Sequence, residues 1–189
     1  MQNFDCDPGQ TSKPFEHRDH LRLLMASALL SSLIIIGTFL RIPFFLGIPI
    51  TFQVPMIQVA TFGLPKPYGI YAVAGYLLLG AAGFPVFTAG GGIGLFFEKT
   101  GGYLIGFLIA TILFQIQPRW WKANILTQFL ALLLHTVIIL ALGIGWHCYL
   151  EGIPVVKMVT TMTPFFGVAF IKLFITLFLL HQFEKILNR

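Results

Sequence analysis

Apolar residues in this chain gather in blocks close to the length that crosses the hydrocarbon core of a bilayer, about 20 residues for a helix. Hydrophobic residues make up 57% of the 189 residues and charged residues only 10%, whereas a soluble domain usually carries about 25% charged residues. Shorter segments that hold most of the charge separate the blocks. The pattern predicts an all-α protein, a polytopic membrane bundle of about six transmembrane helices with the lipid bilayer as its solvent.

The boundaries of the predicted helices follow from the ends of the apolar blocks. The predicted helices cover residues 21–40, about 55–63, 68–82, 103–116, 125–149 and 165–187. Residues 1–20 are polar and contain proline and glycine, so we expect a flexible cytoplasmic tail ahead of a single transmembrane domain, 21–189. Three connections are irregular, namely a proline-broken entry at 43–55, a glycine-rich loop at 83–102, and an amphipathic or irregular segment at 151–164.

The basic residues predict the orientation of the helices, because short loops rich in lysine and arginine stay in the cytoplasm. With both termini cytoplasmic, the inner side holds Lys13, Arg18, Arg22, Lys66, Arg119, Lys122, Lys185 and Arg189, and the outer side holds Arg41, Lys99 and Lys157. The three irregular connections then face outward. The formal charge of +5 reflects this topology, and we expect no binding to nucleic acid.

Lys172 is the one charged residue deep inside a predicted span. An ionisable side chain at that depth is costly and by default marks a functional site. At helical spacing Phe165, Ala169, Lys172 and Thr176 share a face, a small and polar stripe that would point into the bundle. We interpret Lys172 as a functional residue; the alternative is a lysine that extends to the outer interface.

The proline-broken entry offers two polar side chains at membrane depth, Thr51 and Gln53. Its three prolines cannot lie inside one ordinary helix. Non-helical backbone in the bilayer must be buried in protein or line a cavity. Thr51 and Gln53 are therefore candidate binding residues, and a simple kinked connector is the alternative.

The glycine-rich loop is a second candidate binding segment. Gly90 and Gly91 would let the backbone approach a ligand closely, and Thr88 precedes them. The loop is no ATP site, because the Lys-Thr pair follows a glutamate at 98–100 (EKT) where a phosphate loop needs glycine. Any ATP-driven work must come from a partner.

Small and polar residues inside two predicted helices are open to more than one interpretation. In the first helix, Ser27 with Ser31 and Ala28 with Ser32 form a stripe that either packs inside the bundle or presents a docking face. His135 in the fifth helix is expected to be a hydrogen-bonded packing residue rather than a proton carrier.

Catalytic groups are missing from the predicted spans. The carboxylates Glu98 and Glu151 fall in connections and Glu184 is close to the C-terminus. The sequence has no paired carboxylates, no metal-ligand cluster and no nucleophile with its base. We therefore expect no enzyme, no metal site and no cofactor.

Several motifs follow one another in a colinear run that covers about a third of the chain. They are 48–53 (IPITFQ), 65–66 (PK), 76–80 (YLLLG), 83–87 (GFPVF) and 100–107 (TGGYLIGF), and beyond them Pro164, Phe165 and Lys172. On these residues the chain resembles the BioY family, the biotin-specific substrate-binding subunits of energy-coupling-factor transporters.

The resemblance implies a six-helix fold in the bacterial cytoplasmic membrane that captures biotin on its outer side, in a pocket roofed by the first and third connecting loops. The implied site comprises Lys172, Gln53, Thr51, Thr88, Gly90, Gly91, Tyr103 and position Ala169. The implied partners are a membrane coupling subunit and two ATPase subunits, although some members work where none is encoded nearby. The stripe in the first helix would match the family's docking face.

Two departures from the family pattern affect recognition of the biotin ureido ring. Ala169 stands where an aspartate is expected to face the ligand, and the glycine-rich loop lacks the asparagine that some members carry near Gly90 or Gly91. We then expect backbone groups, Thr51, Gln53 or Thr88 to bind the ureido ring. Lys172 is the expected counter-ion of the biotin carboxylate. The alternatives are the same fold carrying another vitamin or small anionic solute, a membrane enzyme, and a structural or assembly protein.

Overall fold

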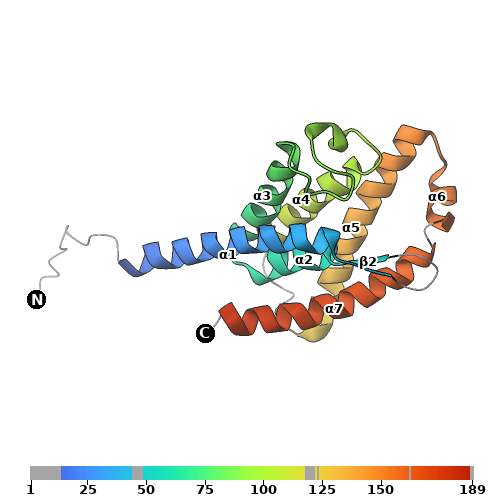
Figure 1. Cartoon of the computed structure of the whole chain (residues 1–189). Coiled ribbons are helices and arrows are strands. Elements are labelled where there is room, and N and C mark those ends of the chain that lie inside the picture. Colours follow the sequence, from blue (N-terminus) through green and yellow to red (C-terminus); the bar gives the residue numbers. More distant parts are fainter. Residues whose placement is uncertain (1–13, 44–48, 118–121, 123, 162, 188–189) are drawn as a thin grey trace, which may run out of the picture.

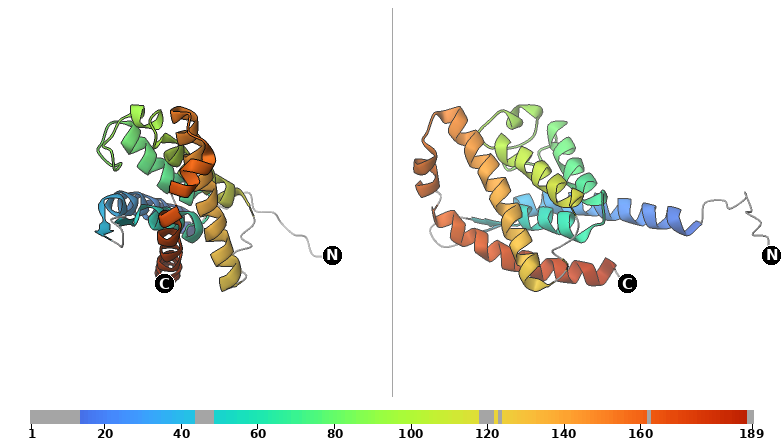
Figure 2. Two further views of the ribbon diagram at one scale, coloured as in Figure 1. Left: turned by 90° about the vertical axis from the view of Figure 1, so that its right-hand side faces the viewer. Right: turned by 180° about the vertical axis from the view of Figure 1, so that it is seen from behind.

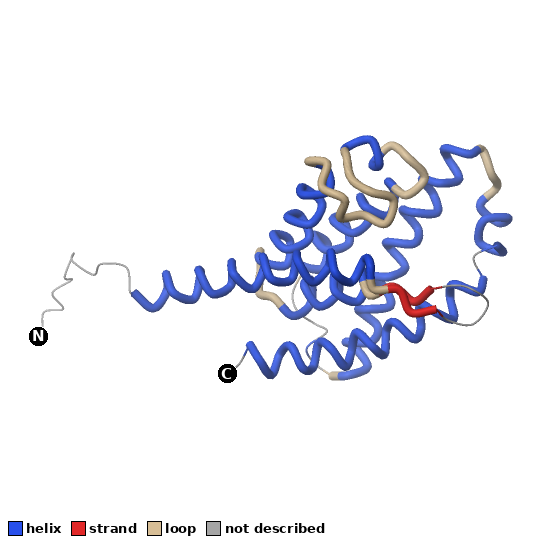
Figure 3. Tube along the Cα trace, viewed as in Figure 1, coloured by secondary structure: helices blue, strands red, loops and turns tan. Residues whose placement is uncertain are grey.

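The computed structural model describes residues 14–43, 49–117, 122, 124–161 and 163–187. The elements are α1 (Pro14–Phe39), β1 (Arg41–Pro43), β2 (Pro49–Thr51), α2 (Gln53–Gly63), α3 (Tyr68–Ala81), the 3-10 helix η2 (Ile93–Phe96), α4 (Gly101–Ile116), α5 (Ile125–Glu151), α6 (Val155–Thr161) and α7 (Thr163–Leu187). Helices dominate this part of the chain (Figures 1 and 3), and the predicted all-α class is confirmed. The two strands are three residues each and pair antiparallel, with Ile42 opposite Ile50.

The short helix α2 is the centre of the bundle. It packs against α1, α3, α4 and α7, and every described residue from Ile57 to its end at Gly63 is buried. One apolar cluster joins α2 to α1, α3 and α4 around Ile34 and Tyr76. A second cluster joins α2 to α4, α5 and α7 around Phe62. Because its neighbours enclose it, α2 contributes side chains to both halves of the core.

The described helices differ in whether they are long enough to cross a bilayer. Three helical segments are long and apolar enough to cross a bilayer, Arg18–Phe39, Ile125–Glu151 and Gly167–Lys185, and the apolar helices α3 and α4 are shorter. The 11 residues of α2 cover only about 16 Å, about half of a hydrocarbon core. The extended segment that ends in β2 continues directly into α2 (Figure 3). The chain is a multi-pass membrane protein in which extended backbone leads into the short central helix α2.

Several boundaries differ from the sequence prediction. Helix α1 begins at Pro14, seven residues before the predicted residue 21, because the helix continues through exposed polar positions such as Arg18. The rest of the predicted tail lies outside the described residues. The segment predicted to be amphipathic or irregular contains the short helix α6. Helix α5 begins as predicted, where Asn124 and Thr127 form a reciprocal capping box.

The irregular connections gather at one end of the bundle. Helix α1 begins and α7 ends at the opposite end (Figures 1 and 2). The hairpin of β1 and β2, the loop around η2, and α6 all lie at the far end from these termini (Figure 1). The fold therefore separates an end made of helix termini from an end made of loops.

Candidate functional site

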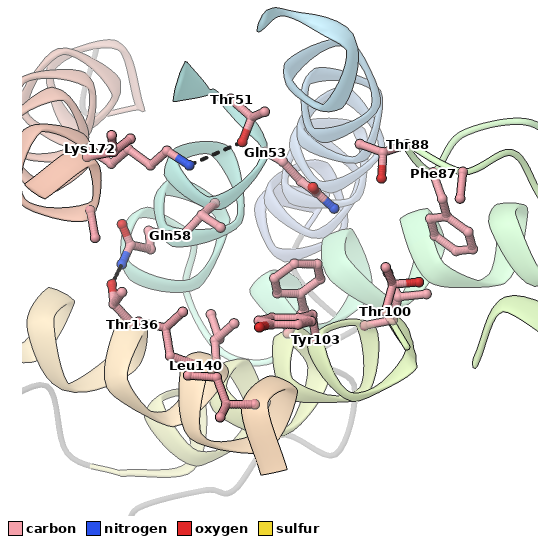
Figure 4. Close-up of a pocket in the computed structure, with 18 residues that line it drawn as sticks. Thr51, Gln53, Gln58, Phe87, Thr88, Thr100, Tyr103, Thr136, Leu140 and Lys172 are labelled. Carbon is pink, nitrogen blue, oxygen red and sulfur yellow. Dashed lines mark hydrogen bonds between the residues drawn. The ribbon is translucent and has the colours of Figure 1, made fainter. Parts of the chain in front are cut away.

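A cavity of about 340 Å³ opens between α2, α4, α5, α7 and the loop after α3. Its size is in the lower part of the range of small-molecule sites, about 300 to 1,000 Å³. Most of its wall is apolar, and its polar side chains are Thr51, Gln53, Gln58, Thr88, Thr100, Tyr103, Thr136 and Lys172 (Figure 4). A largely apolar wall with a few polar groups suits a small amphiphilic ligand.

Lys172 and Thr51 form the charged end of this cavity. The Lys172 ammonium donates a hydrogen bond to Oγ1 of Thr51 at 3.2 Å, and Figure 4 shows the two side chains meeting from α7 and β2. Among the described residues the ion pairs involve Lys99, Lys122 and His147, and no carboxylate contacts Lys172. Ala169, one helical turn earlier, also lines the cavity and is too short to supply a partner. The cavity thus contains a partly buried cation whose only hydrogen-bond partner among the described residues is a neutral hydroxyl.

The predicted helical face of α7 is confirmed at the positions that the structure describes. Ala169 and Lys172 line the cavity, and Thr176 is fully buried one turn further. The side chain of Phe165, the fourth predicted member, lies outside the described residues. The predicted and observed faces of α7 agree because residues three and four apart in a helix share a face.

Gln58 and Thr136 are cavity residues that sequence reasoning missed. The Gln58 amide nitrogen donates to the Leu132 carbonyl at 3.1 Å and to the Thr136 hydroxyl at 2.9 Å. The Thr176 hydroxyl, placed between Gln58 and its own helix, is within 2.9 Å of the Gln58 carbonyl oxygen and within 2.8 Å of the Lys172 carbonyl oxygen. This network ties α2, α5 and α7 together. The available signal was a glutamine inside an apolar helix, which needs polar partners in the membrane.

Gln53 and Tyr103 line the cavity, as the sequence predicts for site residues. Gln53 starts α2, and its amide nitrogen donates to the Tyr76 hydroxyl on α3 at 2.8 Å. Tyr103 comes from the first turns of α4 and packs closely on Gly143 of α5, where a side chain would overlap its ring. Both residues are therefore held by helices other than their own.

The glycine-rich loop contributes only part of its predicted residues. Thr88 and Ala89 line the cavity, whereas Gly90 and Gly91 do not. A tight turn explains the difference: the Phe87 amide donates to the Gly90 carbonyl at 2.9 Å and the Gly90 amide donates to the Phe87 carbonyl at 3.1 Å. The turn places Thr88 and Ala89 at the cavity wall and keeps Gly90 and Gly91 away from it.

Gly91 shapes the loop through contact with its own backbone. A Cβ atom there would overlap the Phe84 carbonyl group, and Gly90 has a φ of 118° that side chains rarely adopt. Both glycines thus shape the fold of the loop, and neither lines the cavity.

An ionic cluster lies beside the cavity at the loop end of the bundle. Lys99 forms an ion pair with Glu151 at the end of α5, and His147 lies 2.8 Å from the same carboxylate. The Trp146 indole donates to the Glu98 carbonyl at 3.0 Å. Thr100, the residue after Lys99, lines the cavity. These contacts fix the end of the glycine-rich loop to α5.

The stripe in α1 is divided between two environments. The Ser27 hydroxyl is 3.0 Å from the Tyr68 carbonyl oxygen and the Ser31 hydroxyl is 2.5 Å from the Ala72 carbonyl oxygen, so both serines pack against α3. Ala28 and Ser32 are exposed. Ser27 and Ser31 belong to internal packing and are not available to a partner.

His135 differs from its predicted role. It is fully buried, and neither ring nitrogen has a hydrogen-bond partner among the described residues. Its ring instead contacts Phe62 and Phe114, each with centroids 5.6 Å away. His135 does not line the cavity.

The chemistry of the site is that of binding. Within the described ranges no three His, Cys, Asp or Glu residues are grouped closely enough to hold a metal ion. The cavity joins one cation, oriented amides and hydroxyls, and an apolar wall that includes Phe107 and Ile139. Such a site can hold a small molecule that has an anionic end, an apolar body and a hydrogen-bonding end.

Comparison with known proteins gives a consistent set of relatives. The sequence model of the BioY family matches residues 10–189. The biotin transporter BioY of Thermotoga maritima is 42% identical over 91 residues, which cover 47% of this chain and 53% of that protein. A probable biotin transporter BioY of Lysinibacillus sphaericus is 37% identical over 89 residues, 47% of this chain and 45% of that protein. The chain thus spans about half the length of these two relatives.

Two further similarities extend over most of the chain. The biotin transporter BioY of Lactococcus lactis is 28% identical over 177 residues, 87% of this chain and 92% of that protein. The crystal structure of the S-component for biotin from an ECF-type ABC transporter superposes with a TM-score of 0.78 at 26% identity, covering 93% of this chain and 95% of that one.

Proposed function

The chain belongs to the BioY family, and from this membership we propose that it takes up biotin across the cytoplasmic membrane as the substrate-specific subunit of a transporter. Biotin would bind in the cavity between α2, α4, α5 and α7. The relatives named as biotin transporters support this substrate, as does the similarity to a biotin S-component. The proposal is one of transport and includes no catalytic step.

The observation that carries the proposal is the state of Lys172. Its ammonium lines the cavity, and within the part of the chain that the structure describes its one hydrogen-bond partner is the Thr51 hydroxyl. A cation in a largely apolar cavity favours a ligand that brings its own negative charge. Biotin presents one carboxylate on an apolar tail, and we place that carboxylate against Lys172.

The remaining site residues keep the roles that the sequence suggests. We propose that Gln53, Thr51, Thr88 and Tyr103 contact the ligand, because each lines the cavity. Ala169 contributes wall surface without a polar group. Gly90 and Gly91 act through the shape of the loop that carries Thr88.

The transporter context is part of the proposal. A membrane coupling subunit and two ATPase subunits would supply the energy, since this chain has no phosphate-binding loop. The two exposed members of the α1 stripe, Ala28 and Ser32, are the residues we assign to docking. Their exposure at a helix surface with small side chains supports close approach of another helix.

We propose that both termini are cytoplasmic and that the loop end faces outward. The first described residues of α1 and the end of α7 lie at the same end of the bundle (Figure 2), which supports a common side. Single cysteines introduced at Lys66 and at Lys99 test this assignment in intact cells. Labelling by a membrane-impermeant reagent at Lys66 and protection at Lys99 would reverse the proposed topology.

Ligand binding tests the function directly. Detergent-purified protein is titrated with labelled biotin, and unlabelled biotin, thiamine and riboflavin compete. We expect biotin alone to displace the label at stoichiometric amounts. Saturable binding of thiamine or riboflavin without binding of biotin would show that the protein has this fold but transports a different vitamin.

A further inference from the structure

The cavity is open to solvent at the glycine-rich loop. Of the described residues that line it, Thr88, Ala89 and Thr100 are exposed, and the others are buried or half-buried. Figure 4 shows Thr88 and Thr100 on the side of the cavity away from Lys172. We call the three exposed residues the mouth of the cavity. A ligand that enters here passes the mouth before it reaches Lys172.

A second recess adjoins the mouth. It has a volume of about 490 Å³, and two residues of the mouth, Ala89 and Thr100, line both the recess and the cavity. The recess differs from the largely apolar cavity in that three of its lining side chains are charged. Its other lining residues are Glu98, Lys99, Leu150 and Glu151. A ligand that crosses the recess thus meets charges first and an apolar wall second.

Lys99 presents its ammonium to solvent from a fixed backbone. Its side chain is 62% exposed although it forms an ion pair with Glu151. The Trp146 indole on α5 donates to the carbonyl oxygen of the preceding residue, Glu98, at 3.0 Å. The backbone beside Lys99 is therefore tied to α5, while the ammonium remains accessible to an anion from solution.

Glu151 can release Lys99 and still keep a partner. Its carboxylate also lies 2.8 Å from Nε2 of His147, one helical turn earlier on α5. An exposed ion pair is weak, because water and salt screen both charges. A carboxylate that arrives from solution can therefore replace Glu151 at Lys99 at small cost.

We propose that the recess is an entry site for organic anions, in which Lys99 binds the ligand carboxylate before the ligand passes the mouth, and Glu151 competes with the ligand for Lys99. The inference rests on the proposed function, in which the ligand carries a carboxylate. Lys99 contacts the ligand during entry, and Lys172 contacts it in the cavity. The entry site therefore acts on the rate of association, as charges at the rim of a binding site do.

The two partners of the ion pair give opposite predictions for association. The rate at which labelled biotin associates is measured by stopped flow at low salt. Lys99→Met should slow association about threefold, because the recess loses its cation and keeps its carboxylates. Glu151→Gln should speed association about twofold, because the competing carboxylate is removed. Both variants break the same ion pair, so a purely structural role of the pair predicts changes in the same direction.

A control variant and a control ligand isolate the charge effect. Lys122 also pairs with a glutamate, Glu184, but does not line the recess, so Lys122→Met should associate at the wild-type rate. A neutral biotin amide should associate equally fast with the wild type, Lys99→Met and Glu151→Gln. In about 1 M salt, where the Debye length is about 3 Å, the differences for biotin should disappear.

The outcomes separate this inference from the proposed function. Wild-type protein that binds no biotin at equilibrium contradicts the proposed function. Wild-type binding with an unchanged association rate in Lys99→Met, or with changes in the same direction in both variants, overturns the entry site. Equal slowing of biotin and its amide by Lys99→Met also overturns it. If Lys99→Met does not fold, Glu151→Gln still decides, because it must speed the association of biotin and not that of the amide.

Discussion

The ammonium of Lys172 and the hydroxyl of Thr51 meet at 3.2 Å across a sequence separation of 121 residues. The contact joins α7 to the short strand β2, at the point where extended backbone turns into helix α2. It brings a cation from one segment and non-helical backbone from another into the same cavity wall. Ligand binding at this wall would therefore engage both segments at once.

Lys172→Met should weaken biotin binding by about ten- to a hundredfold, because a lost charge-assisted contact costs about 1.5 to 3 kcal/mol. Methionine keeps an apolar stem of similar length. A neutral biotin amide should lose much less, and titration calorimetry on both ligands measures the difference. Lys185→Met, an exposed lysine on the same helix, is the control and should bind as wild type. Equal losses for acid and amide would show that Lys172 is structural.

Thr176→Val should destabilise the protein by about 1 to 2 kcal/mol, because the buried carbonyl oxygen of Gln58 loses its donor. Valine has nearly the same shape as threonine, so packing is preserved. Thr176→Ser retains the hydroxyl and is the matched variant, with a smaller expected cost. Reversible unfolding in mixed micelles gives both free energies. If valine were tolerated better than serine, the hydrogen bond to Gln58 would contribute nothing.

Gly91→Ala should distort the loop that carries Thr88, because the new Cβ would overlap the Phe84 carbonyl group. We expect weaker biotin binding and faster proteolysis of the loop, with the helical content unchanged. Gly94→Ala provides the comparison, since a Cβ at Gly94 meets nothing within 4 Å. Limited proteolysis and biotin binding are measured for both variants, and the comparison separates an effect on the shape of the loop from the mere loss of a glycine. Similar behaviour of the two variants would contradict the role assigned to Gly91.

Glu151→Gln should speed biotin dissociation about two- to fivefold, the modest effect expected when a surface ion pair is lost. The variant removes the carboxylate that pairs with Lys99 and His147 and so loosens the loop from α5. Stopped-flow displacement measures the rate. Glu184→Gln removes a different surface ion pair, to Lys122, and should leave the rate unchanged. An unaltered dissociation rate in Glu151→Gln would show that the cluster does not restrain the loop.

Local patterns in the sequence predicted the parts of the site that depend on helical period or on proline. Ala169 and Lys172 share a face because the helix repeats every 3.6 residues, and Thr51 lies where prolines interrupt a helix. The bonds from Gln58 to Thr136 and from Gln53 to Tyr76 could not be predicted, because they join residues 78 and 23 positions apart. Such pairs depend on how the helices cross, which no local pattern encodes.

Contacts at two further residues also depend on segments that the local sequence pattern does not specify. The sequence predicts that Gly91 lets the backbone approach a ligand, and the structure shows that its missing side chain makes room for the backbone of the preceding turn. His135 was expected to hold a hydrogen bond, but the neighbouring helices place aromatic rings around it. In both cases the residue type is unusual for its position, and its contacts come from a segment that the local sequence pattern does not specify.

The brevity of α2 has a consequence for how the protein is made. Its 11 residues are too few to partition into a bilayer as an independent unit, for which about 17 to 25 residues are needed. Its stable place therefore depends on the helices that enclose it, including α7, which follows the other described helices in the chain. During biosynthesis the wall of the cavity is completed only after α7 has been synthesised. A nascent chain released before α7 would lack both Lys172 and the wall that keeps α2 in place.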